Sequence, residues 1–134
     1  MTAVIDSSIA VDVLLRWHRA KHAAAMLKPH ARDVHAPQLI LPETIYALRG
    51  IERGGKASSV QIARALRDVG RFPTHLWGLC PLTKRVWQLR HAVSTYDAYY
   101  IALAEHLNAR LVTADARLAR AIEAAGWCPV DLVI

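Results

Sequence analysis

Short apolar runs alternate with segments of helical periodicity along the whole chain, and this alternation restricts the fold more than any other feature. At least one predicted helix separates each predicted strand from the next, so successive strands need crossover connections and are expected to lie parallel. We expect strands at 4–5, 34–36, 76–82, 111–112 and 130–133, and helices at 9–14, 19–28, 42–53, 59–69, 83–92, 97–107 and 118–125. The sequence therefore predicts an α/β fold, a three-layer α/β/α sandwich with a mainly parallel central sheet.

The length of 134 residues suits one domain spanning residues 1–134, and no repeat or linker divides it. Two cysteines, Cys80 and Cys128, are too few for a disulfide framework or a four-thiolate zinc site. We interpret them as reduced thiols of a cytoplasmic protein. Asp6 precedes any basic or long apolar stretch, so we expect no secretory signal. The longest run without Asp, Glu, Lys or Arg, at 72–83, is too short for a membrane-spanning segment.

The helix predicted at 59–69 has an apolar stripe at three-residue spacing, made of Val60, Ala63, Leu66 and Val69.

The charge balance points to a partner rather than to a fold. The chain has 17 Lys and Arg against 11 Asp and Glu, a formal net charge of +6. Basic surfaces gather phosphates by long-range attraction and counterion release, so the charge favours a polyanionic partner.

Four of the acids occupy a special place in the predicted fold. Asp6 and Asp115 follow predicted strands, while Glu43 and Asp97 stand at the start of predicted helices. The carboxyl edge of a parallel sheet collects the ends of its strands and the N-termini of the helices that follow. All four carboxylates can therefore face one edge of the sheet.

Two explanations fit these acids. Each carboxylate could cap a helix, because it can accept the free N–H groups there and complement the helix dipole. Alternatively, the carboxylates converge in one cleft, where they repel one another and raise each other's pKa unless a cation is present. Oxygen ligands suit Mg²⁺ or Mn²⁺, and such a site beside a basic surface favours metal-assisted hydrolysis of a nucleic acid.

The segments that contain these acids resemble a known family. They are VIDSS at 4–8, LPE at 41–43 with ALR at 47–49, YDAYYIALA at 96–104, and LVTAD at 111–115 with LA at 118–119. In this order they are similar to the motifs of the PIN-domain ribonucleases, and most of all to the VapC toxins of bacterial VapBC toxin–antitoxin pairs. The resemblance spans residues 4–119.

The resemblance implies a role for each site residue. Asp6, Asp97 and Asp115 are expected to ligate the metal, Glu43 to complete the acidic pocket as base or ligand, and Thr113 to position a ligand or water. Many relatives have a polar or acidic residue shortly after the fourth acid. This chain has Ala116 and Arg117 there, and we expect Arg117 to meet substrate phosphate or a neighbouring acid.

Other possible signals carry less weight. His18 and His22 are four residues apart, as two zinc ligands on a helix would be, but the HExxH glutamate is absent and basic residues surround them. The scattered tryptophans and the tyrosines at 96, 99 and 100 could stack on bases, yet such residues more often belong to a core or an interface.

The leading hypothesis is a metal-dependent endoribonuclease, the toxin of a type II toxin–antitoxin pair, that cleaves structured RNA such as tRNA or rRNA with metal-activated water. The resemblance also implies a homodimer and a cognate VapB-type antitoxin. The alternative is a noncatalytic basic RNA-binding module whose acids only cap helices. A third hypothesis is a phosphatase that uses Asp6 as nucleophile, but Ser8 stands where many such enzymes have a second acid.

Overall fold

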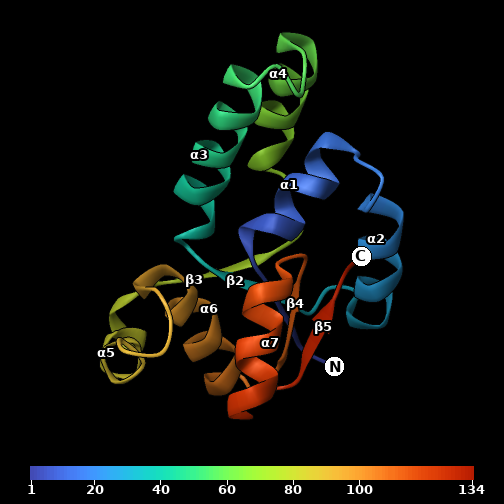
Figure 1. The fold of residues 1–134 in the computed structure, drawn as a ribbon. Coiled ribbons are helices and arrows are strands. Elements are labelled where there is room, and N and C mark those ends of the chain that lie inside the picture. Colours follow the sequence, from blue (N-terminus) through green and yellow to red (C-terminus); the bar gives the residue numbers. More distant parts are fainter.

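The computed structural model describes residues 1–134, and its five strands form one sheet in the order β3-β2-β1-β4-β5, parallel throughout (Figure 1). The strands are β1 (Ala3–Ile5), β2 (Val34–Pro37), β3 (His75–Trp77), β4 (Arg110–Thr113) and β5 (Val130–Leu132). The predicted parallel sheet is therefore confirmed. It begins at its centre with β1, extends to one side through β2 and β3, and then to the other through β4 and β5.

Seven α-helices cover the sheet: α1 (Ser7–Leu15), α2 (Ala20–Leu27), α3 (Ile40–Arg53), α4 (Ser59–Val69), α5 (Thr83–Gln88), α6 (Thr95–His106) and α7 (Ala116–Ala125). Short 3₁₀ turns occupy Lys28–His30 and Cys80–Leu82. Right-handed crossovers place helices on opposite faces when the strand order reverses direction. Accordingly α1 packs with α2, α3 and α4, whereas α6 and α7 contact strands on the other side, which confirms the three layers (Figure 1). No helix combines the length and apolar character needed to cross a membrane.

The two central strands are buried on both faces, and this burial explains their continuous apolar sequence. Val4, Ile5, Leu111 and Val112 have no exposed surface. Ile5 pairs in register with Val112. The next residue of each strand, Asp6 and Thr113, therefore emerges side by side at the carboxyl edge of the sheet.

The third strand is shorter than predicted. The apolar run at 76–82 suggested one strand, but β3 ends at Trp77 and a 3₁₀ turn follows at Cys80–Leu82. Pro81 lacks the N–H that a ladder needs, and its fixed φ suits a helical turn. Likewise, the helix expected at 83–92 ends at Gln88.

The apolar stripe predicted on α4 does not form the buried face of that helix. Ile62 and Ala65 are buried instead, while Val60 and Leu66 are 79% and 43% exposed. Together α3 and α4 form an arm that extends away from the sheet (Figure 1). The arm is only partly covered by the rest of the chain, so it exposes apolar side chains of this stripe.

One acid deep in the fold is neutralised within the chain. Asp12 of α1 is 1% exposed, and the Arg19 Nε at the start of α2 lies 2.9 Å from its carboxylate. Because a buried charge is costly unless it is paired, this ion pair is a structural link between α1 and α2.

Candidate active site

Asp6 is held at the carboxyl edge of β1 by a set of hydroxyl and N–H donors. Its carboxylate accepts the backbone N–H groups of Ser8 and Ile9, so it caps α1. The Ser8 hydroxyl donates to Asp6 Oδ1 and the Thr113 hydroxyl donates to Asp6 Oδ2, each at a distance of 2.5 Å. Asp6 is 6% exposed and takes part in no ion pair. Burial is the main cause that raises its pKa from 3.8 to about 6.

Thr113 and Asp115 join the end of β4 to this network. Thr113 is fully buried, and its hydroxyl accepts the Asp115 N–H over 3.0 Å. The Ala114 N–H donates to the Ser8 hydroxyl, which links the two strand ends further. Asp115 caps α7 by accepting the N–H groups of Arg117 and Leu118.

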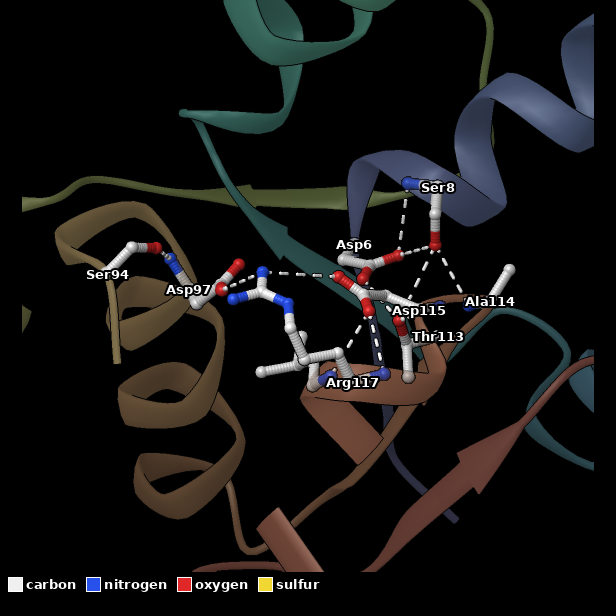
Figure 2. Close-up of polar contacts among 9 residues, drawn as sticks. Asp6, Ser8, Ser94, Asp97, Thr113, Ala114, Asp115 and Arg117 are labelled. Atoms are coloured by element: carbon white, nitrogen blue, oxygen red, sulfur yellow. Dashed lines mark hydrogen bonds and ion pairs between the residues drawn. The ribbon is translucent and has the colours of Figure 1, made fainter. Parts of the chain in front are cut away.

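Arg117 lies between two of the acids, as Figure 2 shows. Its Nη2 is 3.7 Å from Asp97 Oδ2 and 3.8 Å from Asp115 Oδ2, although the side chain is 77% exposed. The expectation that Arg117 meets a neighbouring acid is thus confirmed. Partial burial raises the pKa of Asp97, and the Arg117 charge opposes that rise.

Glu43 lies in the first turn of α3, near enough to Asp97 to feel its charge. The Tyr100 hydroxyl of α6 donates to Glu43 Oε1 over 2.5 Å. Burial raises the pKa of Glu43, and the nearby Asp97 charge adds to the rise. Burial and the bond to Glu43 also raise the pKa of Tyr100, so the phenol keeps its proton and remains a donor.

Helix capping accounts for only half of the acids. Asp6 and Asp115 are N-caps, but the N-cap of α6 is Ser94 and that of α3 is Leu39. Asp97 and Glu43 therefore have no capping role that would explain their position. They face the same edge of the sheet as the two caps, and the charges of these acids influence one another's pKa.

The carboxylates are close but do not form a closed cluster. No group of three or more Asp, Glu, His or Cys side chains lies near enough together to hold an ion, and the Arg117 guanidinium stands between Asp97 and Asp115. The donor set nevertheless fits a hard divalent cation, because it consists of carboxylate oxygens. Asp6 provides the strongest support, since its buried charge lacks a cationic partner within the chain.

Two residues of this site, Ser8 and Tyr100, were not predicted as site residues from the sequence. Ser8 bridges Asp6 and the end of β4, and its position two residues after an acid at a strand end is a common capping pattern. Tyr100 follows Asp97 by three residues and therefore shares its side of α6. Of the discounted histidine pair, His18 precedes α2 and the His22 ring bonds the Ile134 carbonyl.

Comparisons of the sequence with a family model and with individual proteins agree on one family. The model of the PIN domain family matches residues 3–123. Ribonuclease VapC9 of Mycobacterium tuberculosis is 35% identical over 130 residues, which is 97% of each chain. Ribonuclease VapC3 of the same organism is 34% identical over 119 residues, covering 88% of this chain and 85% of that one.

Solved structures share the fold at lower identity. PAE2754 from Pyrobaculum aerophilum superposes with a TM-score of 0.69 at 20% identity, covering 90% of this chain and 86% of that one. VapBC2 from Rickettsia felis, bound to a DNA fragment from its promoter, gives a TM-score of 0.68 at 16% identity with full coverage of both chains. The arrangement of strands and helices is therefore one that known structures contain.

Proposed function

The chain belongs to the PIN domain family, and from this premise we propose that it is an endoribonuclease, the VapC-type toxin of a toxin–antitoxin pair. The 35% identity to a VapC ribonuclease over 97% of both chains supports the activity. The buried Asp6 carboxylate, which has no cation within the chain and feels the charge of Asp115, supports the location of the active site.

Asp6, Asp97 and Asp115 would hold a divalent metal, for which we propose Mg²⁺ or Mn²⁺. Nucleases of this family generally depend on a divalent metal. Such an ion activates water and stabilises negative charge on phosphate oxygens when it is bound. Thr113 and Ser8 fix the Asp6 carboxylate in one orientation by donating to its two oxygens.

We propose that Glu43 accepts the proton of the attacking water. Its Oε1 is occupied by the Tyr100 hydroxyl, which leaves Oε2 to accept a proton. The raised pKa of Glu43 makes it a stronger base than an exposed glutamate. Tyr100 acts as a positioning residue, because it holds Glu43 and does not itself face the reacting atoms in this assignment.

We propose that Arg117 pairs first with the site acids and then with a substrate phosphate. Without metal, its guanidinium partly neutralises Asp97 and Asp115. If these carboxylates held a divalent cation, its charge would take the place of the guanidinium, and the exposed Arg117 side chain would be free to turn to the substrate. The planar guanidinium then suits a substrate phosphate, which it can bind through two parallel N–H groups.

We also propose a VapB-type antitoxin as the protein partner, since VapBC2 from Rickettsia felis shares the fold of this chain. A basic antitoxin side chain inserted among the acids would neutralise them in place of the metal. The homodimer stays a prediction. The exposed apolar side chains of the α3–α4 arm, including Ile45 and Val60, are of the kind that an interface covers.

The test is cleavage of an RNA mixture that includes tRNA by the purified protein, with Mg²⁺ or Mn²⁺ and then with excess chelator. We expect cleavage that requires the metal and is lost in Asp97→Asn while the circular dichroism spectrum is unchanged. The noncatalytic module makes the opposite prediction, because it would bind RNA equally well with chelator and leave it intact. Intact RNA in the presence of either metal would contradict the proposed activity.

A further inference from the structure

A cavity next to the acids has the composition of a binding site for a nucleobase. It has a volume of about 790 Å³ and is lined by Ser7, Leu39, Pro42, Glu43, Tyr46, Ala47 and Tyr96. Most of these residues adjoin a site acid. Ser7 follows Asp6, Tyr96 precedes Asp97, and Tyr46 lies three residues after Glu43, which places both on one side of α3. The cavity therefore continues the acidic site and shares Glu43 with it.

Two aromatic rings on this wall are open to solvent. Tyr46 is 75% exposed and Tyr96 is 59% exposed, although large aromatic side chains usually bury their surface in a core. Tyr46 comes from α3 and Tyr96 from α6, so helices on opposite faces of the sheet bring them to the same cavity. Exposed aromatic faces are the surfaces on which unpaired bases stack, and every base can use them.

The charges of the cavity favour a base over a phosphate. Glu43 is its only charged lining residue, and it is an acid, so a phosphate there would be repelled. The Ser7, Tyr46 and Tyr96 hydroxyls and the Glu43 carboxylate can meet the polar edge of a base. A larger cavity of about 890 Å³ lies between α1, α2 and the end of α4, but none of the four site acids lines it.

We propose that Tyr46 and Tyr96 form a base-binding slot for the unpaired nucleotide next to the cleaved bond. This inference rests on the proposed ribonuclease function. The slot holds the neutral, flat part of the nucleotide while the phosphate lies at the acids. It selects RNA whose target nucleotide is unstacked, as in a loop, because a paired base cannot present its face to the rings.

The test compares Tyr46→Ala and Tyr96→Ala with Tyr46→Phe and Tyr96→Phe. Affinity is measured by fluorescence anisotropy in chelator, with an oligoribonucleotide hairpin that the wild type cleaves when metal is added. A base stacked on one ring is worth roughly 1–3 kcal/mol, so each alanine variant should lose about fivefold to 150-fold in affinity. The phenylalanine variants should keep most of the affinity. Mn²⁺ affinity should stay unchanged in Tyr46→Ala.

Trp87→Ala serves as the matched control, because Trp87 is 67% exposed but belongs to α5 and does not line the cavity. A hairpin series with one abasic nucleotide at each loop position adds a second test. One abasic position should weaken binding to the wild type and have little further effect on Tyr46→Ala.

Three outcomes would overturn the slot. One is alanine variants that equal the wild type in affinity and cleavage, and another is a hairpin series in which no abasic position weakens binding. Affinity could also fall only together with a change of mass in light scattering, which would assign the two tyrosines to an interface between copies of this chain. A wild type that neither binds nor cleaves RNA would instead contradict the proposed function itself.

Discussion

Asp6, the N-cap of α1, and Asp12, within α1, are both buried, yet the fold treats their charges differently. Asp12 is 1% exposed and pairs with Arg19 at 2.9 Å. Asp6 is 6% exposed, accepts only hydroxyl and N–H donors, and has no ion pair. The chain supplies a counter-ion for one buried carboxylate and leaves the other without one.

The difference separates a structural charge from a functional one. Hydrogen bonds orient the Asp6 carboxylate but leave its net charge in place, and its pKa stays raised to about 6 despite those bonds. A carboxylate kept in this state is prepared for a cation from outside the chain. Asp12 needs no such cation, because its partner is covalently part of the same protein.

The largest expected effect is on catalysis. Asp6→Asn should reduce RNA cleavage at least about a hundredfold, the scale of losing one electrostatic stabiliser of a transition state. The fold should persist, because asparagine also caps a helix well. Asp12→Asn should cleave at the wild-type rate when assayed far below its melting temperature. Equal losses in the two variants, measured as initial rates, would remove the distinction between the two carboxylates.

The next effect is on stability and falls on the other aspartate. Asp12→Asn leaves Arg19 without its partner, and breaking a buried ion pair costs about 3–5 kcal/mol. Urea unfolding in chelator should show most of this loss, reduced because the Arg19 side chain is 31% exposed. In Asp12→Asn with Arg19→Gln no unpaired charge remains, so much of the loss should be recovered. A double variant no more stable than Asp12→Asn alone would argue against the ion pair as the cause.

A pH dependence should distinguish the wild type from Asp6→Asn in chelator. The pKa of Asp6 is raised from 3.8 to about 6, so the unfolded chain ionises more readily than the folded protein. Below pH about 4, Asp6 is protonated in both the folded and the unfolded protein, and well above its folded-state pKa it is ionised in both. The destabilisation by the buried Asp6 charge is therefore complete only at the higher pH. The wild type should therefore lose up to about 3 kcal/mol relative to the variant between pH about 4 and about 7. Urea unfolding at several pH values measures this difference, and a constant difference would contradict the assignment.

The smallest expected effect concerns Arg117, the one cationic side chain that pairs with the site acids. Arg117→Ala should strengthen Mn²⁺ binding by about fivefold, because its two exposed ion pairs together contribute about 1 kcal/mol. Arg120→Ala is the control, since Arg120 is an exposed residue of the same helix and has no ion pair. Calorimetric titration that finds the same gain in both variants would point to net charge rather than to the position of Arg117.

The sequence was sufficient for the features that local patterns and topology determine. The alternation of strands and helices predicted the parallel sheet, and acids at strand ends and helix starts predicted a common edge. The neighbour of Arg117 could be anticipated because an arginine two residues after a strand-end acid stays near that acid.

Features that depend on tertiary partners were not predictable. The stripe on α4 has core-like spacing, but Val60 and Leu66 lie on an arm that the rest of the chain does not cover. The bond from Tyr100 to Glu43 joins residues 57 positions apart, and no local pattern indicates it. The apolar run at 76–82 is typical of a strand, but Pro81 favours a helical turn. This is why β3 ends at Trp77.

A metal site centred on Asp6 is tested most directly by a calorimetric titration of metal-stripped protein with Mn²⁺, comparing wild type, Asp6→Asn and Asp12→Asn. We expect the wild type and Asp12→Asn to bind Mn²⁺ with the same affinity. Asp6→Asn should bind at least about tenfold more weakly, since even indirect partners of a metal contribute that much. Equal affinity in all three proteins, or no binding to the wild type, would contradict the claim that the unpaired buried carboxylate is the centre of a metal site.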